Sequence, residues 1–246
     1  MYLDKAVAVI LPAYNASSTL AKTVMEIPSY VDHLILVDDA SNDDTGRIAF
    51  ELGIKHVVFH NKNEGYGANQ KTSYDYVLKL NPDIIVMIHP DYQYTPLIMT
   101  SLVHMLASGV YDVVLASRIL GVGALAGGMP VYKFIANRIL TFFQNILLSH
   151  KLSEYHTGYR AYAYSVLTNC NYKANSNDFV FDNQILSQAI YKGFRIGEVS
   201  CPTRYDASSS SISFSRSVTY GIGVIIVSFA HLFCRFGLHR PKYLNT

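Results

Sequence analysis

Acidic, amide and imidazole side chains follow two short apolar runs of the sequence, at spacings that suit nucleotide and metal binding. Asp38 and Asp39 end the first run, where a carboxylate can accept a hydrogen bond from a base or ribose hydroxyl, or cap the following helix. His89, Asp91 and Gln93 alternate after the second run. Alternate residues of an extended segment point the same way, so we expect these three donors to face a divalent ion such as Mg²⁺ or Mn²⁺, which also binds phosphate oxygens. A proline-anchored turn that exposes Asp91 is the alternative.

Short strands that alternate with helices must hold these side chains. Apolar runs rich in β-branched residues predict buried strands at 7–11, 34–37, 56–59, 83–88 and 113–116. Helices are expected from Ser17–Thr19 to Met25, from Asp43 onward, and over 69–80. This alternation predicts an α/β fold, with a parallel sheet covered by helices on both faces. Ligands of such sheets bind beyond the carboxyl ends of the strands, and the polar clusters follow those ends.

Composition excludes several classes of protein. The chain has 246 residues, of which 50% are hydrophobic, and a formal net charge of +2 without a long block of like charge. Nucleic acid is therefore not an expected partner. Its three cysteines are widely spaced and form no CxxC pair, which argues against a disulfide framework or a cysteine-rich zinc site. The first residues show no secretion signal, so we expect a cytoplasmic protein.

The second half is less regular and ends in an apolar segment. A loop of small residues is expected at 121–128, an amphipathic helix at 132–148, and a polar link at Ser208–Ser211. The run 220–236 is shorter than the ~20 apolar residues of a membrane crossing. Its apolar residues recur at helical spacing between the cations Arg216, Arg235, His239, Arg240 and Lys242. A helix lying on a membrane surface is expected; a single membrane crossing, or packing on its own domain or on a second subunit, are the alternatives.

Several short motifs occur in an order and spacing typical of one enzyme family. They are 11–15 (LPAYN), 37–41 (VDDAS), the stretch around Asp91, 63–67 (NEGYG), 116–118 (ASR), 157–160 (TGYR), 193–199 (GFRIGEV) and 212–214 (ISF). In this order the motifs resemble the family 2 glycosyltransferases. Within that family they are similar to the polyprenol-phosphate branch, typified by dolichol-phosphate mannosyltransferase. The resemblance covers residues 7 to about 236.

The resemblance implies a GT-A fold, which is a Rossmann-like, mostly parallel sheet with helices on both faces, followed here by a C-terminal amphipathic helix. It implies that the nucleotide is bound by Pro12, Tyr14, Asn15, Asp38, Asp39 and Gly67. The metal positions are His89, Asp91 and Gln93, for Mg²⁺ or Mn²⁺. It implies that Arg118, Lys133 and Asn137 bind the acceptor phosphate, and that Asp182 and Arg118 are the catalytic candidates.

The sequence departs from the family pattern at several functional positions. Ala16 replaces an acid after Tyr-Asn, His89 replaces the first acid of the DxD metal motif, Gln184 replaces an acid, and Ser211 replaces a lysine. Lys133 replaces an arginine that the branch has at this position, and Asn137 replaces a serine. A lysine cannot form the bidentate fork of an arginine. These exchanges leave the base of the nucleotide and the identity of the acceptor open.

The expected function is inverting transfer of a sugar from a UDP- or GDP-sugar to a polyprenyl phosphate, at the cytosolic face of a membrane. A hydroxyl of a growing glycan is the alternative acceptor, and it would need a base, for which Asp182 is the candidate before His156. A catalytically silent nucleotide-sugar binding protein is a further alternative, whereas a sugar nucleotidyltransferase would need a Gly-rich phosphate loop. We expect a catalytic domain at 1–211, with a nucleotide-sugar half at 1–115 and an acceptor half at 116–211. The tail 212–246 would associate with membrane or form a homo-oligomer.

Overall fold

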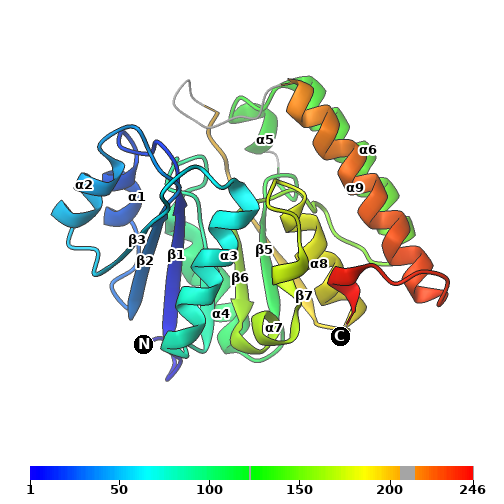
Figure 1. Cartoon of the computed structure of the whole chain (residues 1–246), viewed down its shortest axis with the longest axis horizontal. Coiled ribbons are helices and arrows are strands. Elements are labelled where there is room, and N and C mark those ends of the chain that lie inside the picture. The colour runs from blue at the N-terminus through cyan, green and yellow to red at the C-terminus, as the bar shows by residue number, and fades with distance from the viewer. Residues whose placement is uncertain (122, 206–213, 246) are drawn as a thin grey trace.

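A seven-stranded sheet lies at the centre of the molecule (Figure 1). The computed structural model describes residues 1–121, 123–205 and 214–245. The strands are β1 (Val7–Ala13), β2 (His33–Asp38), β3 (His56–Phe59), β4 (Ile84–Met87), β5 (Val113–Ser117), β6 (Arg160–Ala163) and β7 (Ile196–Ser200). Their order across the sheet is β3-β2-β1-β4-β6-β5-β7.

The sheet is parallel apart from one strand. β6 is antiparallel to both of its neighbours, β4 and β5, while β7 runs parallel to β5. The prediction of a mostly parallel sheet is confirmed, and the five expected strands are present within one or two residues of their bounds. β6 and β7 were not predicted. Their sequences, RAYA and IGEVS, contain too few consecutive apolar residues to stand out as buried runs.

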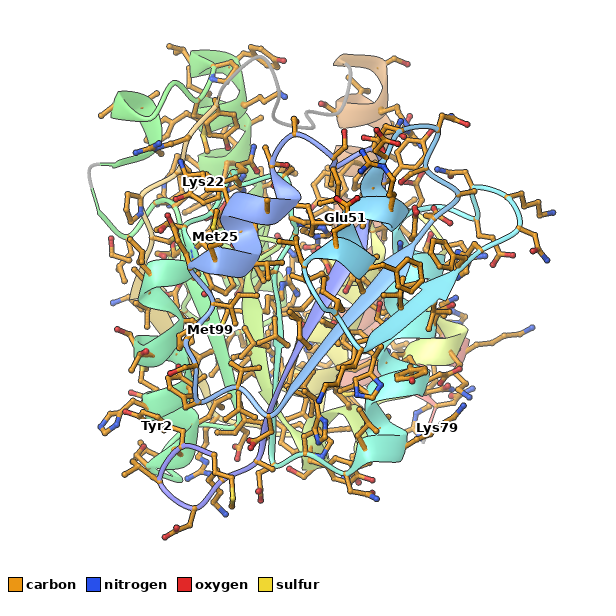
Figure 2. The ribbon with its side chains drawn as sticks, turned by 90° about the vertical axis from the view of Figure 1, so that its left-hand side faces the viewer. Tyr2, Lys22, Met25, Glu51, Lys79 and Met99 are labelled. Atoms are coloured by element: carbon orange, nitrogen blue, oxygen red, sulfur yellow. The ribbon has the colours of Figure 1, made fainter. Side chains whose placement is uncertain are left out.

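Helices cover both faces of the sheet, as expected. They are α1 (Leu20–Met25), α2 (Thr45–Glu51), α3 (Tyr66–Val77), α4 (Met99–Ala107), α5 (Gly123–Ala126), α6 (Val131–Leu147), α7 (Tyr164–Asn169), α8 (Phe181–Tyr191) and α9 (Phe214–Arg235). Alternate residues of β1 enter two separate hydrophobic clusters, one on each face. One cluster includes α3, α7 and α8, and the other includes α1, α2 and α4. In Figure 2, Met99 of α4 and Lys79, which follows α3, are labelled on opposite sides of the sheet.

The tail forms a longer helix than we expected. α9 has 22 residues, and its segment Ser215–Arg235 has a mean hydropathy of 1.8, which is long and apolar enough to cross a membrane. The expectation that this segment is too short was therefore wrong. A helix packed within a water-soluble domain can have the same length and composition. α9 lies beside α6 (Figure 1) and also contacts α8, so part of it packs on the rest of the chain.

Two expectations about the second half fall near or outside the described residues. The polar link Ser208–Ser211 and the boundary between 211 and 212 lie in the segment 206–213, which is not described. The division into a catalytic domain and a tail therefore stays a prediction. The small-residue segment 121–128 contains the short helix α5, and the amphipathic helix expected at 132–148 is α6, at Val131–Leu147.

Candidate active site

The loops that follow β1 and β2 are joined by side chains expected to bind the nucleotide. Asp38 pairs in register with Ala13 across the two strands, and its Oδ1 accepts hydrogen bonds from the backbone N and the Oγ of Ser41, at 2.9 and 2.5 Å. Ser41 Oγ in turn accepts from the N–H of Asn15 at 2.8 Å. Asn15 has a φ of +52°, a conformation that asparagine tolerates. Tyr14, beside it, is about half exposed. The structure thus brings Pro12, Tyr14, Asn15 and Asp38 to one edge of the sheet.

Asp39 holds the loop that leads to α3. Its carboxylate accepts from the backbone N–H groups of Glu64 and Gly65, at 2.8 and 3.0 Å, and lies 2.7 Å from Nδ1 of His60. The side chain is 3% exposed. Asp39 therefore fixes the 60–65 loop beside Asp38, and its expected part in nucleotide binding stays a prediction.

Gly67 is required by neighbouring protein atoms. A Cβ at this position would collide with the backbone oxygen of Ser176 and would lie 2.9 Å from Cβ of Phe181. The Gly67 N–H also donates to the carbonyl of Asn177 at 2.8 Å. We expected glycine here because a nucleotide approaches the backbone. In the structure, the group that approaches is the 176–177 backbone, which seats α3 against the start of α8.

The expectation that His89, Asp91 and Gln93 share one side of an extended segment was wrong. The chain turns at Pro90 and Asp91, and Tyr92 adopts a φ of +55°. Side-chain alternation holds only for extended backbone, so it does not apply across this turn. The Gln93 N–H donates to Asp91 Oδ1 at 3.1 Å, which closes the turn. That the three residues bind one metal ion stays a prediction.

The side chain of His89 faces protein atoms through both ring nitrogens. Nε2 lies 3.0 Å from the hydroxyl of Tyr66, and Nδ1 lies 3.4 Å from the carbonyl oxygen of Pro12. A metal ligand must offer a free nitrogen lone pair, so in this arrangement His89 does not fit as a ligand. Asp91 and Gln93 supply oxygen donors, which fit a hard divalent ion completed by substrate phosphates. Within the described residues, no cluster of three or more His, Cys, Asp or Glu side chains could hold a metal ion by itself.

Asp182 is held by two side chains of α3. Its Oδ2 accepts from the Tyr66 hydroxyl at 2.6 Å, and its Oδ1 accepts from Nε2 of Gln70 at 3.0 Å. Asp182 is 6% exposed, and burial together with its charge raises the pKa of Tyr66 well above the usual value. Both carboxylate oxygens therefore already accept a hydrogen bond, and the chain His89–Tyr66–Asp182 joins β4, α3 and α8.

A buried ion pair lies among the residues expected to bind the acceptor phosphate, a region that we call the acceptor end. Glu154 is fully buried, and its carboxylate accepts from the backbone N–H and from Nε of Arg118, both at 2.8 Å, and from Nη2 as well. Nη2 also donates to the carbonyl of His156, and Nη1 donates to the hydroxyl of Tyr205, both at 2.9 Å. The guanidinium has five N–H groups, and among the described residues four of them donate to protein acceptors. Burial works against the charge of Glu154, but the nearby guanidinium lowers its pKa below the usual value.

The other two expected acceptor residues lie on α6, beside this pair. Asn137 is buried and donates from Nδ2 to Glu154 at 2.7 Å. Desolvation, and then the charge of Arg118, lower the pKa of Lys133, and Lys133 lies one helical turn before Asn137 on α6. The structure thus brings Arg118, Lys133 and Asn137 together. Glu154 was missed because its partner is 36 residues away, and the only signal in the sequence was an isolated acid shortly before the TGYR motif.

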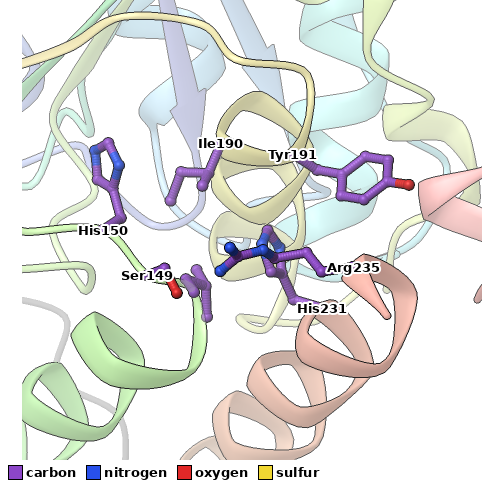
Figure 3. A pocket seen from close by; sticks show the side chains of 7 residues that line it. Ser149, His150, Ile190, Tyr191, His231 and Arg235 are labelled. Atoms are coloured by element: carbon purple, nitrogen blue, oxygen red, sulfur yellow. The ribbon is translucent and has the colours of Figure 1, made fainter. Parts of the chain in front are cut away.

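A separate cavity of about 540 Å³ lies at the C-terminal ends of α6 and α9 (Figure 3). Its lining includes His150, Tyr191, His231 and Arg235. None of the predicted site residues lines it. The residues expected to carry the chemistry lie instead at the strand ends, on α6 and at the start of α8.

The fold and these strand ends define a class of protein. A mostly parallel sheet with helices on both faces carries polar groups after β1, β2 and β4, and an ion pair after β5. This is the GT-A architecture. Within that class, the sequence profile of "Glycosyl transferase family 2" matches residues 8–170. The chain belongs to this family and is a glycosyltransferase.

Similar proteins include two enzymes named for lipid-phosphate acceptors. The polyprenol monophosphomannose synthase of Mycolicibacterium smegmatis is 27% identical over 199 residues, which are 78% of this chain and 74% of that protein. The UDP-N-acetylglucosamine–dolichyl-phosphate N-acetylglucosaminyltransferase of Methanococcus voltae is 25% identical over 237 residues, 89% of this chain and 92% of that protein. These similarities confirm the resemblance to the polyprenol-phosphate branch.

Solved structures share the fold. Glucosyl-3-phosphoglycerate synthase from Mycobacterium tuberculosis in complex with UDP superposes with a TM-score of 0.71 and 21% identity, over 96% of this chain and 81% of that one. The same enzyme with Mn²⁺, UDP and glucosyl-3-phosphoglycerate has a TM-score of 0.68 and 20% identity, over the same shares of the two chains. At this identity the likeness describes the fold.

Proposed function

We propose that this protein is an inverting glycosyltransferase that moves a sugar from a nucleotide diphosphate donor, a UDP- or GDP-sugar, to a polyprenyl phosphate. The observation that carries the proposal is the buried Glu154, which pairs with Arg118 and accepts from Asn137, with Lys133 one helical turn before Asn137 on α6. Arg118 and Lys133 carry two positive charges against the one negative charge of Glu154, so the cluster keeps a positive charge that attracts a phosphate. Two relatives named for polyprenol or dolichyl phosphate acceptors support the same class.

The donor would lie at the strand ends, with its nucleotide near Tyr14, Asn15 and Asp38 and its diphosphate near Asp91. Asp91 and Gln93 would hold the Mg²⁺ or Mn²⁺ ion. When bound, such an ion neutralises charge on the diphosphate leaving group. Solved structures of the same fold contain UDP together with Mn²⁺, which supports a divalent ion here.

The attacking group would be an oxygen of the acceptor phosphate. This oxygen is already anionic and needs no general base, whereas a hydroxyl acceptor would need one. Asp182, the candidate base, has both oxygens engaged by Tyr66 and Gln70. This arrangement favours a positioning role for Asp182 and the phosphate over a glycan hydroxyl. Direct displacement at the sugar carbon would invert its configuration.

An apolar surface beside the acceptor end supports a lipid substrate. α6 and α9 lie side by side (Figure 1), and both carry large exposed apolar side chains. We define the apolar face as the exposed side chains of Val131, Ile135, Ile139, Phe142, Phe143, Ile146, Val218, Ile222, Ile226, Phe229 and Phe233. Exposed apolar patches of this kind mark membrane or protein contacts. Lys133 and Asn137 belong to the same helix as part of this face, with Asn137 on its buried side, so a membrane bound to the face would lie close to the acceptor residues.

Turnover of a labelled donor with matched acceptors tests the proposal. We expect transfer to a polyprenyl phosphate and none to the corresponding polyprenol, since the phosphate is both nucleophile and anchor. Asp182→Asn should keep its rate within about tenfold, because an amide can still contact Tyr66 and Gln70. Inactivity of Asp182→Asn, together with transfer to a glycan hydroxyl, would contradict the proposal and make Asp182 the base. Family membership favours an enzyme over a silent binding protein, and a complete absence of turnover would reverse that preference.

A further inference from the structure

A chain of hydrogen bonds runs from α6 through α8 and α9 to His156, two residues after Glu154. Gln144 of α6 donates from Nε2 to Oδ1 of Asn183 at 2.8 Å. Asn183 presents its Nδ2 to the hydroxyl of Tyr220, on α9, at 2.6 Å. The Tyr220 hydroxyl lies 2.9 Å from Nδ1 of His156. The hydroxyl of Tyr220 therefore connects the tail helix to His156.

This chain determines which ring nitrogen of His156 carries the proton. An amide nitrogen only donates, so the Tyr220 oxygen accepts from Asn183. Among the described residues, the hydroxyl proton has one acceptor within reach, which is Nδ1 of His156. Burial lowers the pKa of His156 to about 3, so the ring is neutral near pH 7. Its one proton is then on Nε2.

The resulting Nε2–H group has no acceptor in the described part of the chain, although it is buried. Buried N–H groups nearly always have a partner, because an unpaired donor destabilises the fold. The ring lies at the acceptor end of the site: Nη2 of Arg118 donates to the His156 carbonyl at 2.9 Å, and the charges of Glu154 and Arg118 act on the imidazole. The missing partner is thus an acceptor atom within reach of this ring, whose backbone carbonyl binds Arg118.

We propose that Nε2–H of His156 donates a hydrogen bond to a phosphate oxygen of the acceptor, beside Arg118 and Lys133. The site would then combine two cations, which attract the phosphate, with one neutral donor, which orients it. This inference rests on the proposed acceptor class. It also assigns Tyr220 a positioning role. Tyr220 lies on α9, which carries part of the apolar face, and its hydroxyl keeps the proton of His156 on Nε2.

Two substitutions of His156 separate this contact from a structural role. A glutamine places its amide near the position of Nε2, and an asparagine places it near Nδ1. For transfer to a polyprenyl phosphate, we expect His156→Asn to raise the acceptor KM about tenfold, the loss typical of one hydrogen bond to a charged group. His156→Gln should stay within about threefold of the wild type. The donor KM should not change in either variant, and both should unfold at the wild-type temperature within a few degrees.

A spectroscopic measurement tests the tautomer directly. In the protein labelled with ¹⁵N-histidine, the His156 ring should show the proton on Nε2, and Tyr220→Phe should shift this signal toward a mixture of tautomers. The same variant should raise the acceptor KM by about two- to threefold, less than His156→Asn, because the ring remains.

The outcomes distinguish the inference from the function on which it rests. Three results would overturn the contact while the wild type still glycosylates polyprenyl phosphate. They are an equal rise of the acceptor KM in His156→Asn and His156→Gln, a change confined to the donor KM, and a proton on Nδ1 of His156. A wild-type protein that never uses a phosphate acceptor would overturn both. A raised acceptor KM in His156→Asn that glutamine restores would support the contact.

Discussion

At the carboxyl ends of β1 and β2, Asp39 accepts hydrogen bonds from the backbone of Glu64 and Gly65. Directly after β5, by contrast, the guanidinium of Arg118 donates to Glu154, which lies in the segment between α6 and β6. Both acids are buried. The first holds a loop through backbone amide groups, and the second balances a buried charge. The nucleotide end is therefore built from groups that hold loops in place, while the acceptor end depends on a balance of charge. Removing an acid should have different consequences at the two ends.

Glu154→Gln should give the largest effect. It leaves Arg118 buried without a counter-charge, and breaking a buried ion pair in this way costs about 3–5 kcal/mol of stability. Unfolding in urea measures this loss. Asp112→Asn is the matched control, because Asp112 pairs with the more exposed Arg195, and exposed pairs contribute little. Equal losses in the two variants would remove the contrast between a charge-balanced acceptor end and the rest of the chain.

Asp91→Asn should come next, through activity. We expect turnover to fall by about 10²–10³-fold, as for other losses of charge stabilisation in a transition state, with little change in unfolding. Thermal stabilisation by the free nucleoside diphosphate with Mn²⁺ should disappear as well. Asp44→Asn provides the control at the same end of the molecule, since Asp44 pairs with Arg47 on the surface. Wild-type activity that persists in a chelator would show that Asp91 has another role.

The apolar face provides a third test, of intermediate size. Replacing Phe142 and Ile226 by serine should weaken binding to anionic vesicles at least about tenfold, because each buried apolar side chain contributes about 1.5–3 kcal/mol. Met25→Ser is the control: Met25 is 74% exposed and lies on α1, away from this face (Figure 2). Vesicle flotation measures the binding. Unchanged flotation, together with dissociation of an oligomer in sedimentation, would mean that the face contacts a second subunit.

The smallest effect concerns pH and the nucleotide end. Burial works against the charge of Asp43, but hydrogen bonds from Thr45 and Ser17 outweigh it and lower the pKa of Asp43 to about 2. A depressed folded-state pKa stabilises the protein above the unfolded pKa near 3.8, and this stability is lost as the pH falls toward 2. Unfolding measured between pH 5 and pH 2 should therefore show a decline, in the range these two pKa values define. Asp43→Asn should be less stable at pH 5 and less dependent on pH, and an unchanged slope would contradict this origin.

The sequence by itself determined the parallel half of the fold and the polar ends of its strands. Each strand there is a local apolar run, and the acids follow within one or two residues, so neighbours in the chain remain neighbours in space. The order of short motifs was also sufficient to indicate the family, which the match over residues 8–170 confirms. These features depend on local pattern and local spacing.

Tertiary structure decided the rest. β6 enters the sheet antiparallel between β4 and β5, Tyr92 turns the chain where alternation was expected, and Glu154 meets Arg118 across 36 residues. α9 packs on α6 and α8, and Tyr220 thereby reaches His156. A local pattern specifies which face of an element is buried, but it does not specify which distant element covers that face. The acceptor end is built almost entirely from such long-range contacts, so only the folded chain shows how its charges and hydrogen bonds are paired.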